Sequence, residues 1–127
     1  SKAPKVAIIA CGPILHNALS AAKELEKEKI GTIVVNNHTI KPLDEKTILE
    51  IVRKCGAVGT VEEHQVAGGM GSAVAELLAK KCPMPMEFIG MQDIFGESGT
   101  PKELIEKYGM GVRAIIVAVK NSLKRVK

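Results

Sequence analysis

Residues 57–80 read AVGTVEEHQVAGGMGSAVAELLAK, and the order of residue types in this segment indicates the class of fold. Ala57 to Val61 is short, apolar and β-branched, which is typical of a buried strand. A polar hinge and a glycine-rich turn follow, and from Ser72 onward the apolar residues recur at helical spacing. The segment therefore predicts a strand, a hinge, a glycine turn and a helix.

The polar residues of this segment come at the carboxyl end of the predicted strand, where open α/β sheets usually bind ligands and partners. Two carboxylates and an imidazole follow the strand directly, at Glu62, Glu63 and His64. The glycines that permit a tight turn or a close backbone approach are Gly68, Gly69 and Gly71. These residues and the helix N-terminus are the first candidates for a functional site.

Several roles are open to the hinge residues 62–64. A carboxylate beside an imidazole can perform acid–base chemistry, and the same groups can bind a metal, although three adjacent residues cannot easily all face one ion. The interpretation we favour is hinge hydrogen bonding, in which a carboxylate accepts backbone amides of the glycine turn. Contact with a partner chain is the next alternative.

The glycine turn raises the question of anion binding, because the amides at a helix N-terminus can hold a phosphate. The motif is GGxG rather than GxGxxG, and it follows the third predicted strand rather than the first. No acidic residue stands at the end of the next predicted strand to bind a ribose. These departures argue against a dinucleotide site.

Strand and helix patterns alternate along the whole chain. Strands are predicted at Lys5–Ala10, Gly31–Asn36, Ala57–Val61 and Glu87–Gly90. Helices are predicted at Ile14–Glu28, from an Asp44 N-cap to about Cys55, from Ser72, from a Thr100 capping box to near Gly109, and over the stripe from Val112 to Leu123. The alternation predicts one domain over residues 1–127, a three-layer α/β/α sandwich with a mostly parallel sheet.

Two polar loops supply the remaining candidates. His38 follows the second predicted strand, and it either contacts an anion or a neighbouring chain or is a satisfied loop histidine. Asp93 and Phe95 lie in the loop MQDIFGESG, where the ring more simply fills the core than meets a ligand. No Ser/His/Asp or Cys/His set forms a recognisable nucleophile motif. We therefore expect the domain to assist chemistry that is carried out elsewhere.

Composition excludes several classes of function. Hydrophobic residues make up 46% of the 127 residues and aromatic residues only 2%, which predicts an aliphatic core and argues against stacking sites for bases or flavin rings. The net charge of +4 comes from the C-terminal residues Lys120, Lys124, Arg125 and Lys127, which is too narrow a patch to predict nucleic-acid binding. The chain has no apolar run long enough to span a bilayer. The three cysteines, Cys11, Cys55 and Cys82, show no pairing pattern and indicate a reduced, cytoplasmic setting.

Three segments together carry a resemblance to a known family. HTIKPLDE (38–45), VEEHQVAGGMGSAVAE (61–76) and DIFGESGTPKELIEKYG (93–109) resemble the C-terminal domain of transketolases, above all that of the split type. The resemblance extends from Lys5 onward. Deoxyxylulose-phosphate synthase and the E1 β subunits of 2-oxo acid dehydrogenases share this domain, whereas FGESG (95–99) favours transketolase.

The resemblance implies a mixed sheet whose first strand is antiparallel, with this chain beginning at the family's second strand. The predicted strands would then lie in the order Gly31–Asn36, Lys5–Ala10, Ala57–Glu62, Glu87–Gly90. The edge at Gly31–Asn36 would be uncovered and able to pair with another copy. Because the chain would begin at the family's second strand, we expect it to be a piece cut from a longer protein.

The resemblance also implies a function, namely two-carbon ketol transfer between sugar phosphates in the pentose phosphate pathway. Thiamine diphosphate and a divalent metal would bind domains other than this one, so no residue here is expected to be catalytic or to bind cofactor or metal. The expected partners are the remaining transketolase domains or subunit and further copies, as in a dimer, and the isolated chain is expected to be inactive. The equivalent domain of the synthase or of an E1 β subunit, which would dock to an acyltransferase core, and a flavodoxin-like binding module stay open as alternatives.

Overall fold

The computed structural model describes residues 4–10, 14–36, 45–63, 69–91 and 101–126, with the side chains of Glu63, Met91 and 101–110 left aside. Strands and helices alternate in the described chain, as the sequence predicts. The elements are β1 (Val6–Ala10), α1 (Leu15–Lys27), β2 (Thr32–Asn36), α2 (Glu45–Val52), β3 (Ala57–Glu63), α3 (Gly69–Lys81), β4 (Met86–Met91) and α4 (Pro101–Lys124).

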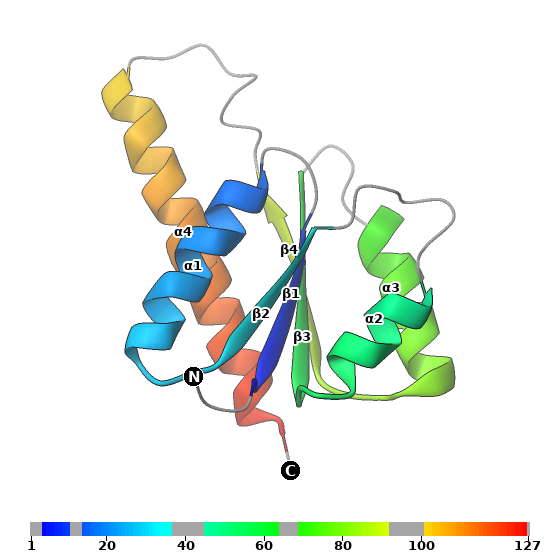
Figure 1. Cartoon of the computed structure of the whole chain (residues 1–127). Coiled ribbons are helices and arrows are strands. Elements are labelled where there is room, and N and C mark those ends of the chain that lie inside the picture. The colour runs from blue at the N-terminus through cyan, green and yellow to red at the C-terminus, as the bar shows by residue number, and fades with distance from the viewer. Residues whose placement is uncertain (1–3, 11–13, 37–44, 64–68, 92–100, 127) are drawn as a thin grey trace.

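The strands form one parallel sheet in the order β2-β1-β3-β4, which confirms the predicted order. Helices α1 and α4 cover one face and α2 and α3 cover the other, so the molecule is a three-layer sandwich (Figure 1). In the centre, Val6 of β1 lies opposite Thr32 on one side and Ala57 on the other. Because all strands run the same way, their carboxyl ends meet at one end of the sheet.

Each face of the sheet carries its own aliphatic core, as the composition predicts. The core under α1 and α4 consists of Val6, Ile8, Ala10, Ile14, Ala18, Ala21, Leu25, Ala57, Val61, Ile89, Ile115 and Val119. The core under α2 and α3 consists of Ala7, Ile9, Ile48, Val52, Val58, Met70, Val74, Leu77 and Leu78. Successive residues of β1 alternate between the two cores, so this central strand is fully buried on both sides.

The prediction of two C-terminal helices is wrong, because α4 is one helix from Pro101 to Lys124. Gly109 and Gly111 lie inside it and do not end it. A glycine in a helix interior costs about 1 kcal/mol relative to alanine, and fully burying one aliphatic side chain contributes about 1.5–3 kcal/mol. Ile115 and Val119 are both fully buried, so the packing of α4 outweighs its glycines.

The sequence predicts an inward stripe on the first helix at Ile14, Leu15, Ala18, Leu19, Ala22 and Leu25, and the buried face of α1 departs from it. Leu19 was expected to point inward and is instead about half exposed, at 48% of its surface. The buried positions are Ala18, Ala21 and Leu25, together with the polar Asn17. Leu19 follows Ala18 by one residue, about 100° around the helix, and therefore lies beyond the edge of the buried face.

Candidate functional site

The carboxyl end of β3 and the first turn of α3 form the best-defined polar arrangement among the described residues. The side chain of Glu62 is buried there, and its Oε1 atom accepts two backbone hydrogen bonds. The donors are the N–H groups of Met70 at 2.5 Å and of Gly71 at 3.0 Å. This confirms the hinge interpretation, in which a carboxylate accepts amides of the glycine segment.

The sequence favours this arrangement for electrostatic reasons. The first N–H groups of a helix have no acceptor within the helix, and the N-terminus carries a partial positive charge. A carboxylate at the end of the preceding strand accepts hydrogen bonds from these N–H groups and places a negative charge beside the partial positive charge. The amides of Met70 and Gly71 are therefore already bound to an anion of the chain itself, and an external phosphate would have to displace Glu62 to reach them.

Two of the glycines lie in a helix and not in the predicted turn. Gly69 and Gly71 were expected in a turn that precedes a helix from Ser72, whereas α3 begins at Gly69 and contains both. The hydrogen bonds of Glu62 explain the earlier start, because they satisfy the amides of the first helical turn.

Gly71 is needed for close packing between α3 and the sheet. A Cβ atom at this position would lie 2.7 Å from Cδ1 of Phe88 and 3.0 Å from Oγ1 of Thr60. At Gly69 a Cβ atom would have no atom within 4 Å. A larger residue therefore meets no steric obstacle at Gly69, whereas Gly71 sets the distance between α3 and the β3–β4 pair.

Thr60 is a residue of this site that the sequence analysis missed. It lies in β3 with its side chain buried toward α3, and its Oγ1 atom has no hydrogen-bond partner in the described part of the chain. A hydroxyl group in an otherwise apolar strand was the signal that could have drawn attention to it. The hydroxyl faces the bare Cα of Gly71, where any larger side chain would press on it.

The other predicted candidates are only partly visible. Glu63 is the last residue of β3, and its side chain lies outside the described residues. His38, His64, Gly68, Asp93 and Phe95 also lie outside them, as does the Asp44 cap. Their assignment to loops that contact a partner stays a prediction.

Further polar groups of the described residues do not converge on a second chemical centre. No group of three or more His, Cys, Asp or Glu side chains in these ranges could hold a metal ion. Within the same ranges no helix has the length and apolar character needed to cross a membrane. Cys55 and Cys82 are half-buried free thiols, and burial raises the pKa of Cys55 against a smaller opposing effect of the Lys54 charge.

An open groove of about 450 Å³ runs beside the outer edge of the sheet. Its lining residues come from α4 and β4 and are Glu87, Arg113, Ala114, Val117, Ala118 and Asn121. Phe88, the next residue of β4 after Glu87, is 59% exposed. The groove therefore lies between α4 and the beginning of β4, and an exposed aromatic ring follows Glu87 in the same strand.

Comparison with known proteins places these features in a family. The sequence profile described as "Transketolase, C-terminal domain" matches residues 1–115. The subunit SqwH of a 6-deoxy-6-sulfo-D-fructose transketolase from Clostridium sp. (strain MSTE9) is 43% identical over 120 residues, which are 94% of this chain and 37% of that protein. The 1-deoxy-D-xylulose-5-phosphate synthase of Caldanaerobacter subterraneus is 39% identical over 124 residues, which are 97% of this chain and 20% of the synthase.

A solved structure agrees with both sequence matches. The structure described as "Split gene transketolase, inactive beta4 tetramer" superposes with a TM-score of 0.82 and 44% identity, over 99% of this chain and 41% of that one. The chain therefore spans well under half the length of each protein it matches here.

Proposed function

This chain belongs to the family of transketolase C-terminal domains, and we propose that it serves as that domain in a transketolase. The activity to which it contributes is two-carbon ketol transfer between sugar phosphates. The observation that carries the proposal is the match to the split-gene transketolase, at 44% identity and a TM-score of 0.82 over 99% of the chain. The family match also removes the flavodoxin-like alternative.

The proposed role of the domain is structural. The buried carboxylate of Glu62 accepts hydrogen bonds from two backbone amides, so this polar group at the carboxyl end of β3 serves to hold β3 and α3 together. We propose that thiamine diphosphate, its divalent metal and the catalytic groups belong to the remainder of the longer protein. The domain then supports association with that remainder and with further copies, in keeping with the tetramer named for the split-gene relative.

The setting of this function is proposed to be the reducing cytoplasm and the pentose phosphate pathway. Free thiols at Cys55 and Cys82 are compatible with a reducing compartment.

A domain exchange tests the proposal. In the split-gene transketolase subunit, the region that superposes on this chain is replaced by the chain, and the hybrid is combined with the second gene product of that enzyme. We expect the hybrid to assemble and to transfer ketol units with added thiamine diphosphate and Mg²⁺. The subunit without the region is the matched control and should be inactive, as should the purified chain alone. Ketol transfer by the chain alone would contradict the structural role.

The second candidate is the equivalent domain of deoxyxylulose-phosphate synthase, which the 39% identity to the Caldanaerobacter enzyme favours. The same exchange in that synthase separates the candidates. A transketolase domain should restore the transketolase hybrid and leave the synthase hybrid much less active. The reverse result would assign the chain to the synthase.

A further inference from the structure

Strand β4 ends the sheet, and one of its edges has no neighbouring strand in the described chain. The N–H of Val58 in β3 donates to the carbonyl of Pro85 at 3.0 Å, and the register pairs Val58 with Met86. In a parallel pair, alternate residues direct their backbone groups to the same neighbour. The backbone groups of residues 87, 89 and 91 therefore face β3, and those of Met86, Phe88 and Gly90 point outward.

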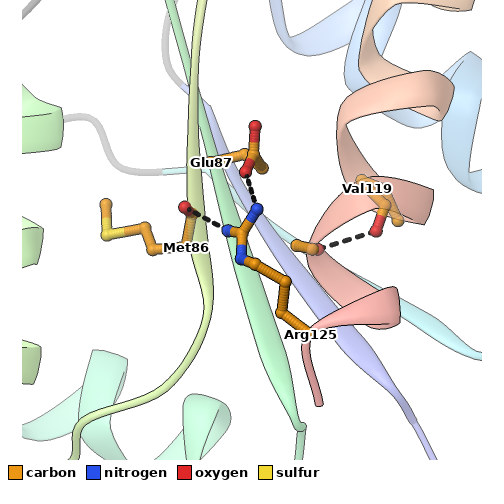
Figure 2. Close-up of polar contacts among 5 residues, drawn as sticks. Met86, Glu87, Val119 and Arg125 are labelled. Carbon is orange, nitrogen blue, oxygen red and sulfur yellow. Dashed lines mark hydrogen bonds and ion pairs between the residues drawn. The ribbon is translucent and has the colours of Figure 1, made fainter.

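Arg125 covers one of these outward groups. Its Nη2 atom donates to the carbonyl of Met86 at 3.0 Å, and its Nη1 atom lies 2.5 Å from Oε2 of Glu87 (Figure 2). The planar guanidinium allows both contacts at once, which an ammonium group on a lysine does less well. The guanidinium thus lies across the outer edge of β4 at the beginning of the strand.

The base of this contact is fixed by the end of α4. The N–H of Arg125 donates to the carbonyl of Ser122 at 3.1 Å. The buried hydroxyl of Ser122 in turn donates to the carbonyl of Val119 at 2.7 Å. Val119 is fully buried in the core, so the backbone from which Arg125 extends is anchored to the sheet.

An edge with outward backbone groups is a template for strand addition, and charged side chains are a common means of blocking it. We propose that the side chain of Arg125 blocks strand addition at this edge and so prevents a second copy of this chain from pairing its own β4 with it. A second copy is the relevant strand donor because it presents the identical edge, and two such edges can pair antiparallel about a two-fold axis. The exposed ring of Phe88 would add apolar contact to such a pair.

The test compares Arg125→Ala with Lys124→Ala in the 127-residue chain. Lys124 is exposed and one residue earlier in the same helix end, so the control removes the same charge. We expect Arg125→Ala to form an additional, concentration-dependent species in sedimentation velocity, with self-association at least about tenfold stronger than that of Lys124→Ala. The hydrogen-exchange rates of the backbone amides of Phe88 and Gly90 should fall several-fold in that species. An unchanged species distribution in Arg125→Ala would overturn the proposal.

Two further variants separate edge pairing from unfolding. In Arg125→Ala/Phe88→Lys, two lysines would face each other across the two-fold pair, so the additional species should disappear while the thermal midpoint stays close to that of Arg125→Ala. If the species persists in the double variant, or if the amides at 88 and 90 are not protected, the association does not use the β4 edge and the proposal fails. Glu87→Gln keeps the bond from Arg125 to Met86 available and should leave the species distribution as in the wild type.

Discussion

Glu62 Oε1 lies 2.5 Å from the backbone nitrogen of Met70, so a buried carboxylate at the end of β3 is joined directly to the first turn of α3. The same oxygen accepts the N–H of Gly71 at 3.0 Å. One side chain therefore fixes where the strand ends, where the helix starts and how the two meet. Its removal leaves buried donors without an acceptor.

Replacing Glu62 should reduce the stability of the fold. We expect Glu62→Ala to lower the free energy of unfolding by about 2–3 kcal/mol, because two charge-assisted bonds to the helix N-terminus are lost. Glu62→Gln keeps an acceptor oxygen and should cost about 1 kcal/mol. Urea unfolding followed by circular dichroism measures both. Glu76→Ala, which removes only an exposed pair with Lys80, is the control and should stay within about 0.5 kcal/mol. Equal losses in Glu62→Ala and Glu76→Ala would contradict the capping role.

The two helical glycines should respond in opposite ways to alanine. Gly71→Ala places a methyl group against Phe88 and Thr60 and should destabilise the chain by about 1–3 kcal/mol. Gly69→Ala meets no atom within 4 Å and should be neutral or stabilising by up to about 1 kcal/mol, since alanine is the better helix former. Thermal and urea denaturation of the pair give the comparison. A stable Gly71→Ala variant would show that α3 can move away from the sheet at little cost.

Alanine substitutions on the buried and the exposed face of α4 should differ in their effect on stability. Ile115 is fully buried, and Ile115→Ala should lower the free energy of unfolding by about 2–5 kcal/mol through lost burial and a residual cavity. Val117 is 53% exposed beside the groove, and Val117→Ala should change it by less than about 0.5 kcal/mol. Equilibrium unfolding in urea at fixed pH distinguishes these outcomes. Similar values for both variants would mean that α4 does not pack as described.

Cys55 should react slowly with thiol reagents at mildly alkaline pH. Burial raises the pKa of its thiol, so less thiolate is present than in a free cysteine at the same pH. In a Cys11→Ser/Cys82→Ser background, the rate of iodoacetamide alkylation should begin to rise at a higher pH than in the urea-unfolded chain, which is the control. Equal pH profiles in the folded and unfolded chain would contradict the shift.

The same shift has a consequence for stability against pH. Burial raises the pKa of the folded thiol. Its contribution to stability is therefore fully present below the pKa of an unfolded cysteine, about 8.5. As the pH rises above that value, the unfolded state ionises first and the contribution is progressively lost. Replacing Cys55 by serine should flatten this part of the stability profile above about pH 8.5.

The sequence predicted the sheet well because its signals are local. Continuous aliphatic runs marked β1 and β3, the alternation with amphipathic helices required a parallel sheet, and the resemblance supplied the strand order. The capping role of Glu62 was also foreseeable, because a carboxylate followed by a glycine-rich helix start has a clear electrostatic use.

The features that were missed depend on distant parts of the chain. Gly109 indicated a break, and only the burial of Ile115 and Val119 against the sheet explains why α4 is continuous. The steric role of Gly71 depends on Phe88, which belongs to the next strand. The contact of Arg125 with Met86 likewise joins the end of α4 to the edge of β4. Pairs of this kind have no signature in the spacing of residues.

The central place of β1 affects how the chain folds during synthesis. Val6 pairs with Ala57 and shares a core with Val119, so the contacts of this strand span almost the whole chain. Non-local contacts of this kind slow folding, because the loop entropy is lost before the contacts form. At about 5–20 residues per second, a ribosome would complete α4 roughly 5–25 s after β1. During that interval β2 and β3 become available to pair with β1, but the core on the α4 side of β1 stays incomplete until Ile115 and Val119 are added. The aliphatic β1 is therefore the segment that a chaperone would have to shield.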